Sequence, residues 1–213
     1  MSDSARTYWG AQAQSFDDEP DHGLLEPEIR LAWRNLLLEH LPPPPADVID
    51  LGCGTGSLSV LLAQSGYDVR GLDFADEMVT AATEKALAAK VAATFRQGDA
   101  ATPPYEPSSC DVVVSRHVLW AIPDPSAALR HWVRLLRPNG RLVLIEGHWS
   151  TGAGIAASDC ERLVRQHLAS VTVRHLDDES LWGRPIEDER YLIVGGNASL
   201  QSPTVGTTKR SPR

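Results

Sequence analysis

The sequence has little of what marks several classes of protein. Its 213 residues include only 3 cysteines, which are widely spaced and form no Cys-x-x-Cys pair. This excludes a disulfide scaffold, argues against a zinc cluster and fits free thiols in a reducing compartment. No apolar run is long enough to span a bilayer, and the first residues lack the basic and then apolar pattern of a signal peptide. We therefore expect a cytoplasmic protein without a membrane partner.

Positive charge is also scarce. The chain has 20 Lys and Arg residues against 28 Asp and Glu residues, which gives a net charge of -8. A protein of this charge has no dominant basic surface to attract a phosphate backbone, so we expect no nucleic-acid partner. With 42% hydrophobic residues, the chain can form one sizeable core and one domain. A homodimer is left open.

From Asp47 onward, short β-branched runs alternate with longer segments that carry apolar residues three and four positions apart. This alternation is typical of βαβ units around a mostly parallel sheet. The candidate strands lie at residues 48–51, 68–72, 93–95, 111–115, 141–145, 171–173 and 190–194. We therefore predict an α/β protein with one doubly wound, Rossmann-like sheet of seven strands.

The two ends of the chain differ in composition from this core. A helix is predicted from about Leu24 to Leu41, and the prolines that follow it stop it. We predict a single domain, 1–196, made of an N-terminal helical lid, 1–45, and a core, 46–196. Residues 197–213 are rich in Ser, Thr and Pro and are predicted to form a disordered tail.

The most informative segment is a strand that runs into a glycine-rich loop and then a helix, Val48-Ile-Asp-Leu-Gly-Cys-Gly-Thr-Gly-Ser57. Glycines let the chain turn sharply and let a ligand lie against bare backbone, while the helix offers unpaired N–H groups. The loop therefore predicts a cofactor site. Ser57 stands where the dinucleotide fingerprint Gly-x-Gly-x-x-Gly has its third glycine, which weakens NAD as the ligand. Asp50, in the strand before the loop, favours a ligand with positive charge.

Acidic residues follow the next two strands. Asp73 ends the second strand, where a carboxylate in this fold accepts hydrogen bonds from both hydroxyls of an adenosine ribose. NAD and S-adenosylmethionine (SAM) would both satisfy Asp73. Asp99 follows the third strand, where its carboxylate could accept a hydrogen bond from an adenine amine. Because Gly-Asp pairs are also common in turns, the role of Asp99 stays open on the residues alone.

Five motifs, in this order and spacing, resemble those of class I SAM-dependent methyltransferases. They are Asp-Leu-Gly-Cys-Gly-Thr-Gly56, Gly-Leu-Asp-Phe-Ala-Asp-Glu-Met78, Gly98-Asp-Ala, Cys110-Asp-Val-Val-Val-Ser-Arg-His-Val-Leu-Trp120 and Leu135-Leu-Arg-Pro-Asn-Gly-Arg-Leu-Val-Leu144. The resemblance covers roughly residues 48–146. It implies SAM as the cofactor and a seven-stranded sheet whose last strand is antiparallel. Both ends of the chain are similar, more loosely, to small-molecule methyltransferases of actinobacteria.

The resemblance also implies which residues would bind SAM. The glycines of the loop would hold its methionine part, with Asp50 near the ammonium group, and Asp73 would hold the ribose. Phe74 or Met78 would flank the adenine, and Asp99 with the Ala100 backbone would contact its amine. The implied cofactor-binding set is Tyr8, Asp50, Gly52, Cys53, Gly54, Gly56, Asp73, Phe74, Met78, Gly98, Asp99, Ala100 and Ser115. Tyr8 could cover the carboxylate end of SAM or merely fasten the N-terminal helix.

Histidines are the first candidates for the chemistry of methyl transfer. The reaction is an in-line displacement with a good leaving group, so the protein mainly aligns the reactants and excludes water, and a base is optional. His117 and His148 follow the fourth and fifth strands, where ligands bind in an open sheet, and His22 lies in the predicted lid. We predict these three as catalytic candidates, although each could simply bond a backbone carbonyl.

Arg116, Trp120 and Trp149 stand beside these histidines and are the predicted substrate contacts. Arg116 could pair with an acceptor carboxylate or form a structural ion pair, and the tryptophans would make an apolar wall for a ring. No Asn-Pro-Pro-aromatic motif follows the fourth strand, which argues against amide and adenine N-methylation. No cluster of carboxylates with an asparagine can be assembled, so we predict no metal.

The acceptor is predicted to be small, because residues 150–157 are too few for a substrate-binding insertion. The favoured function is methyl transfer from SAM to O, N or C of a small aromatic or heteroaromatic metabolite. Three alternatives stay open: a SAM-dependent methyltransferase that acts on RNA or protein, an NAD-dependent oxidoreductase, and a SAM-binding module without catalysis.

Overall fold

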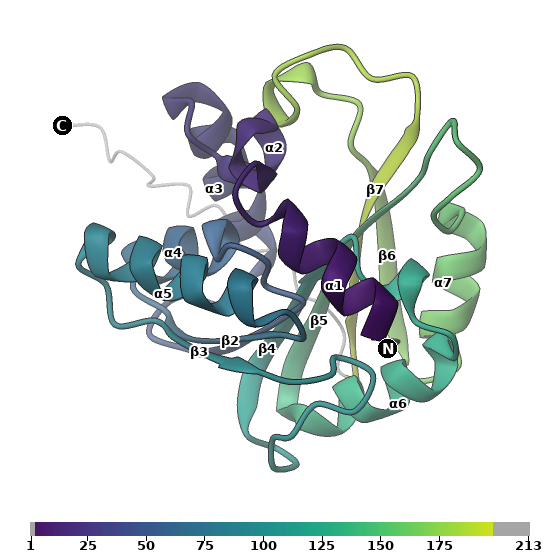
Figure 1. Ribbon diagram of the computed structural model, residues 1–213. Coiled ribbons are helices and arrows are strands. Elements are labelled where there is room, and N and C mark those ends of the chain that lie inside the picture. The colour runs from purple at the N-terminus through teal and green to yellow at the C-terminus, as the bar shows by residue number, and fades with distance from the viewer. Residues whose placement is uncertain (1–2, 198–213) are drawn as a thin grey trace, which may run out of the picture.

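The computed structural model describes residues 3–197, and a seven-stranded sheet lies at its centre (Figure 1). The strands are β1 (Asp47–Leu51), β2 (Asp68–Asp73), β3 (Thr94–Gln97), β4 (Cys110–Arg116), β5 (Leu136–His148), β6 (Ser170–His175) and β7 (Glu189–Gly196). Their order in the sheet is β3-β2-β1-β4-β5-β7-β6. The first five strands pair in parallel, whereas β7 is antiparallel to both of its neighbours, β5 and β6. The predicted doubly wound sheet with an antiparallel last strand is confirmed.

Helices cover both faces of this sheet. They are α3 (Pro27–His40), α4 (Ser57–Gln64), α5 (Asp76–Ala89), α6 (Pro125–Leu135) and α7 (Ala157–Arg165). One buried cluster joins α3 and α4 to the face that carries Val48 and Val112. The other joins α6 and α7 to the face that carries Ile49 and Val113. Successive side chains of a strand point to opposite faces of the sheet. Because both faces are covered, the central strands are apolar at nearly every position in the sequence.

Two tryptophans tie the core to loops at the carboxyl edge of the sheet. Trp33 in α3 and Trp132 in α6 are both 0% exposed, as their positions on apolar helix stripes predict. Their indole N–H groups donate hydrogen bonds to the carbonyl oxygens of Leu181 and Ala100, each at 2.7 Å. Leu181 precedes β7 and Ala100 follows β3. The core therefore helps to position both loops.

The first described segment packs on the core at this same edge. It contains α1 (Asp3–Gln12), a 3-10 turn (Phe16–Asp18) and the short α2 (Pro20–Gly23), and Figure 1 shows α1 beside α5. Asp17 accepts a hydrogen bond from the Thr55 hydroxyl at 2.6 Å and forms an ion pair with Lys85 of α5 at 2.7 Å. Glu19 pairs with Arg184, in the connection before β7, at 3.1 Å. These contacts tie the segment to the glycine loop, to α5 and to the connection before β7, and its role as a lid stays a prediction.

The predicted tail, 197–213, lies outside the described residues except for Asn197. Within residues 3–197, no helix is both long and apolar enough to cross a membrane.

Candidate active site

A cavity of about 460 Å³ lies at the carboxyl ends of the central strands, beside the first residues of β7. In an open α/β sheet this is the edge at which ligands bind. The N-terminal segment contributes Trp9, Phe16, Glu19, Asp21 and His22 to its lining. The half near β1 and β2 is lined by Asp50, Gly52, Cys53, Gly54, Leu58, Asp73, Phe74, Met78 and Ala100. All of these except Leu58 belong to the predicted cofactor-binding set.

The three loop glycines have positive φ angles, which L side chains rarely adopt: +74° at Gly52, +53° at Gly54 and +78° at Gly56. A Cβ at Gly52 would lie 2.3 Å from Val118, and one at Gly56 would lie 2.8 Å from Ala82. A Cβ at Gly54 would instead meet the ring of Phe16 at 3.3 Å. Two of the glycines thus allow close packing within the core, and the third allows Phe16 of the N-terminal segment to approach the loop.

An alanine at position 54 would be strained by about 1 to 3 kcal/mol, because its φ angle would be positive. The loop would shift to relieve this strain. We therefore expect Gly54→Ala to weaken the binding of S-adenosylhomocysteine (SAH) about tenfold. Gly152→Ala is the matched control, because its φ is also positive, at +81°, but a Cβ there meets nothing within 4 Å. Calorimetric titration of both variants with SAH measures the difference. An unchanged affinity in Gly54→Ala would show that this backbone does not hold the ligand.

Two buried carboxylates face the cofactor half of the cavity. Asp50 is 2% exposed and accepts a hydrogen bond from the Ser59 hydroxyl at 2.6 Å. Burial raises the pKa of Asp50 to about 6, although Ser59 and the Arg116 charge act in the opposite direction. Asp73 accepts from the backbone N–H groups of Gly54, at 2.9 Å, and Ala75, at 3.0 Å, and burial raises its pKa as well. A cationic ligand beside Asp50 would favour its ionised form.

Two hydrogen bonds, one of them to the end of β2, hold the loop after β3. Asp99 accepts a hydrogen bond from the backbone N–H of Ala101 at 2.8 Å, and the N–H of Gly98 donates to the Asp73 carbonyl at 2.8 Å. Among the described residues, the lining of the cavity includes Ala100 but neither Gly98 nor Asp99. Asp99 therefore shapes the turn that presents Ala100, and a direct contact of its carboxylate with adenine stays a prediction.

The turn after β4 brings a histidine into the other half of the cavity. His117 has a φ of +59°, and its backbone N–H donates to the Ile145 carbonyl at 2.8 Å. The buried carboxylate of Glu146, in β5, accepts the next two backbone N–H groups, from Val118 at 3.0 Å and Leu119 at 2.7 Å. Such a backbone conformation costs free energy and needs support from its surroundings. Glu146 gives that support and thereby positions His117.

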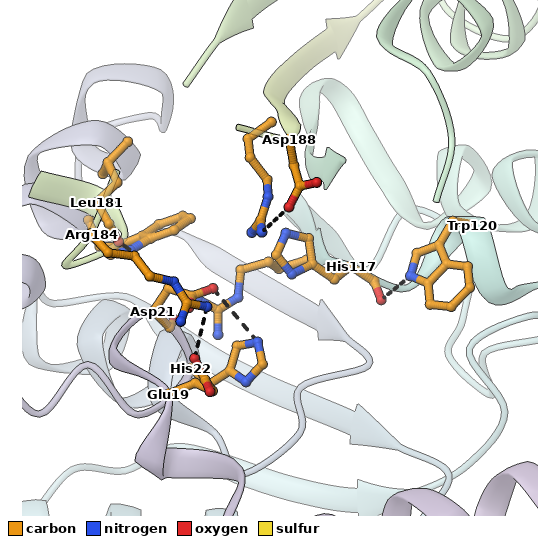
Figure 2. A network of polar contacts seen from close by, with 11 residues as sticks. Glu19, Asp21, His22, His117, Trp120, Leu181, Arg184 and Asp188 are labelled. Carbon is orange, nitrogen blue, oxygen red and sulfur yellow. Dashed lines mark hydrogen bonds and ion pairs between the residues drawn. The ribbon is translucent and has the colours of Figure 1, made fainter. Parts of the chain in front are cut away.

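Aromatic rings surround the His117 imidazole. It stacks on Trp182 with centroids 6.3 Å apart and meets Trp149 edge-on at 5.2 Å. Trp149 in turn meets Trp120 at 5.3 Å, and the Trp120 indole N–H donates to the His117 carbonyl at 2.9 Å (Figure 2). The Nε2 atom of His117 is buried and has no hydrogen-bond partner among the described residues. Trp120 and Trp149, the predicted wall for an acceptor ring, thus lie beside His117 together with Trp182, and their contact with an acceptor stays a prediction.

Charge and burial keep two imidazoles neutral here. Burial and the neighbouring charges of Arg116 and Arg190 hold the pKa of His117 well below its usual value. Burial and Arg116 also lower the pKa of His22, which stacks on Phe16 with centroids 4.4 Å apart. A neutral imidazole can accept a proton or a hydrogen bond, or bind a metal.

One group in the cavity has the composition of a metal site, which the sequence did not indicate. Asp21, His22 and His117 can bring one ligand atom each to within 4.8 Å of one another. Figure 2 shows Asp21 and His22 below His117; the buried Asp21 Oδ2 atom lies 3.7 Å from His22 Nε2 and has no hydrogen-bond partner among residues 3–197. The buried guanidinium of Arg116 donates a hydrogen bond to the Asp21 carbonyl and lies close to both histidines. This fixed positive charge opposes the binding of a cation.

Comparisons with known proteins now decide the family. A family profile described as "Methyltransferase domain" matches residues 49–144. The ubiquinone biosynthesis O-methyltransferase of Ralstonia nicotianae is 29% identical over 79% of this chain and 68% of its own length. That of Xanthomonas axonopodis pv. citri is 33% identical over 66% of this chain and 56% of its own length. The chain belongs to the class I SAM-dependent methyltransferases.

A solved structure has a fold similar to that of this SAM-dependent methyltransferase. The magnesium protoporphyrin IX methyltransferase of Synechocystis, which was solved with bound SAM, matches with a TM-score of 0.60 and 26% identity. The match covers 78% of this chain and 76% of that one. SAM is therefore the cofactor, and the buried Asp50, the glycine loop and the Phe74 and Met78 side chains at the cavity fit its charge and its rings.

Several predicted site residues of the methyltransferase do not reach the cavity. Tyr8 is 59% exposed and packs edge-on against Trp9, which does line the cavity. Ser115 is 0% exposed, and its hydroxyl donates to the Leu51 carbonyl at 2.8 Å. His148 is exposed at the end of β5 and is absent from the lining within the part of the chain that the structure describes. The predicted ligand contacts of these three residues therefore stay predictions, and their side chains do not line this cavity.

Sequence reasoning missed three cavity residues near the last strand: Arg184 and Asp188, in the connection before β7, and Arg190, at its start. Because β7 is antiparallel, its first residues lie at the carboxyl end of β5, where Gly147 pairs with Arg190. The resemblance had already implied an antiparallel last strand. That topology was the signal that could have placed Arg190 at the ligand edge.

Proposed function

We propose that this methyltransferase transfers the methyl group of SAM to a hydroxyl oxygen of a small aromatic metabolite, with His117 as the proton acceptor. The observation that carries the proposal is His117, which lines a cavity walled by tryptophans and whose buried Nε2 atom has no hydrogen-bond partner among the described residues. A buried acceptor atom without a partner is rare unless a ligand or water completes it. A flat acceptor with one donor group satisfies both the atom and the walls.

The cofactor half holds one reactant. Asp50 would hold the ammonium group and Asp73 the ribose, and the glycine loop would lie along the methionine part. When bound, SAM supplies an electrophilic methyl group on a positively charged sulfur. Phe16, which packs on Gly54, and Trp9 cover this half and exclude water.

The acceptor half binds and orients the other reactant. Trp120 and Trp149 would hold the ring, and His117 Nε2 would accept the hydroxyl proton as the oxygen bonds to the methyl carbon. The electron pair of the broken C–S bond stays on sulfur, so the products are SAH and the methyl ether. Positioning of this kind supplies most of the rate in a reaction whose leaving group is already good. The two ubiquinone biosynthesis relatives are named O-methyltransferases, which supports oxygen as the methylated atom.

A metal-assisted form of the same reaction is the second candidate, because Asp21, His22 and His117 could hold a divalent cation. The metal would replace His117 in binding the acceptor oxygen. Arg116 disfavours it, as its charge lies beside both imidazoles. Dialysis against EDTA separates the two forms, because turnover should be unchanged without a metal and lost with one.

The test of the proposal has two steps. Calorimetry measures the binding of SAH, with NADH as the comparison ligand. The protein is then incubated with SAM that carries a labelled methyl group and a panel of hydroxyarenes, and labelled methyl ethers are sought by mass spectrometry. Binding of SAH together with a methyl ether supports the proposal. Failure of SAH to bind, or products methylated only on nitrogen or carbon, would contradict it.

The lid offers a separate prediction. Asp17→Asn removes the ion pair with Lys85. Because both side chains are half-buried, we expect this pair to contribute about 1 kcal/mol to holding the lid closed. SAH should therefore dissociate about five times faster from the variant. Stopped-flow fluorescence of the cavity tryptophans follows the release. Glu39→Gln is the control, since it breaks an exposed ion pair with Arg174 away from the cavity. Equal release rates in Asp17→Asn and the native protein would mean that this contact does not keep the lid closed.

A further inference from the structure

Arg190 is a buried guanidinium with few partners. The residue is 9% exposed, lines the cavity and comes from the start of β7. Its contact with Asp188 is long, at 3.4 Å, and appears as the dashed line at Asp188 in Figure 2. Its Nε atom is buried and has no hydrogen-bond partner within residues 3–197. A guanidinium has five N–H donors, so most of the hydrogen-bonding capacity of Arg190 is unused.

Two indoles hold this guanidinium in place. Its central carbon lies 4.7 Å from the ring centre of Trp182 and 5.7 Å from that of Trp149. The Trp182 indole is fixed by a hydrogen bond from its N–H to the Leu176 carbonyl at 2.9 Å. Asp188, the neighbouring carboxylate, also accepts the backbone N–H of Ser150. The Arg190 guanidinium is therefore oriented by aromatic rings, and Asp188 is its one ion-pair partner among the described residues, at 3.4 Å.

The other two cavity arginines are engaged differently. Arg184 is an exposed residue that forms an ion pair with Glu19 of the lid at 3.1 Å. Arg116 donates to the Asp21 carbonyl and lies within the field of the Asp21 and Asp50 carboxylates. Both arginines thus hold parts of the protein together. Arg190 is left as the guanidinium with free donors at the acceptor end.

Arg190 and His117 contact the same two tryptophans. Both pack against Trp149 and Trp182, so the two groups border the same space. We propose that the acceptor is a hydroxyarene carboxylic acid whose carboxylate binds Arg190 while its hydroxyl meets His117. A planar carboxylate matches the fork of a guanidinium, and the ring between the two groups matches the flanking indoles. This inference rests on the proposed function and names the substrate class for it.

The assignment predicts discrimination between an acid and its neutral derivative. A carboxylate gains charge-assisted hydrogen bonds from Arg190, whereas an ester or amide leaves that charge with only its long contact to Asp188. An aryl phosphate offers related oxygens, but its second negative charge would lie close to Asp188. The acid should therefore bind best among compounds with the same ring.

The experiment uses the full chain saturated with SAH. Salicylate with salicylamide, para-hydroxybenzoate with its methyl ester, and phenyl phosphate are titrated, and quenching of tryptophan fluorescence gives each Kd. We expect at least one acid to bind about tenfold more tightly than its neutral partner, the ratio that one charge-assisted hydrogen bond supplies. Arg190→Gln should abolish the preference and leave the Kd for SAH unchanged. Arg174→Gln, at an exposed ion pair on β6, is the matched control and should keep it.

Three results would overturn the inference: acids and neutral partners that bind equally well or not at all, a preference that survives in Arg190→Gln, or tighter binding of the phosphate. If Arg190→Gln does not fold, Arg190→Lys keeps the charge without the fork and should reduce the preference for the acid. The proposed function fails separately, through loss of SAH binding or of methyl ether formation. A protein that binds SAH and methylates neutral phenols as readily as acids would keep the function and lose the carboxylate site.

Discussion

Replacement of His117 by alanine should lower the turnover of the methyltransferase by about 10², the lower end of the range for a positioned general base, because its lowered pKa makes this imidazole a weak base. The SAH affinity should hardly change, because the cofactor half of the cavity is formed by other residues. Steady-state kinetics with any acceptor from the hydroxyarene panel, together with calorimetric titration of SAH, measures the two effects separately. A loss in turnover without a loss in cofactor binding is the signature of a group that acts on the acceptor.

Two further variants make this result interpretable. His167→Ala removes a histidine that contacts Ser126 at 3.2 Å outside the cavity, and it should leave turnover unchanged. His117→Gln keeps a hydrogen-bonding side chain but cannot take a full proton, so it should be nearly as slow as His117→Ala. If His117→Ala lost SAH binding and turnover to the same extent, the histidine would be structural and the base would have to be sought elsewhere.

The sequence predicts the backbone of this site better than the directions of its side chains. The edge of the sheet, the glycine loop and Asp73 follow from local patterns, because a strand, a sharp turn and a helix start each leave a signal in neighbouring residues. Which of two adjacent residues faces the cavity depends on how an element is rotated. Trp9 rather than Tyr8 lines it because α1 packs on α5, and no pattern within α1 carries that information.

Other features depend on contacts between distant segments. Arg190 reaches the acceptor end because β7 is inserted antiparallel beside β5, more than forty positions from Gly147 along the chain. Asp17 looks like part of a solvated acidic run, yet it binds Thr55 and Lys85. Glu146 follows an apolar strand and looks like a residue at the surface, but it is 0% exposed. Burial of such charged groups is decided by the whole fold, and the partners that make it tolerable are far away in sequence.

Glu146→Gln should change the pH dependence of stability more than any other carboxyl substitution in the core. Burial raises the pKa of Glu146 from its ordinary 4.5 to about 8. Below the ordinary value, the carboxyl is protonated in both the folded and the unfolded chain. Between the two values, the unfolded chain releases the proton and the folded chain keeps it, so the free energy of unfolding falls as pH rises, by about 1.4 kcal/mol per pH unit. Above the raised pKa, the loss is complete.

Glutamine cannot ionise, so Glu146→Gln should lack this part of the fall, while its amide oxygen can still accept the N–H groups of Val118 and Leu119. As pH rises to about 8, the free energy of unfolding should therefore fall less in Glu146→Gln than in the native protein. The difference between the two should change by a few kcal/mol, on the order of the free energy that corresponds to the pKa shift. Urea unfolding at a series of pH values measures it, with the exposed Glu84→Gln as control. The burial of Asp50 acts in the same direction but is common to both proteins, so it cancels in the difference. Parallel curves for Glu146→Gln and the native protein would mean that the Glu146 carboxyl is ionised in the fold, and the support of the His117 turn would then come from a full negative charge.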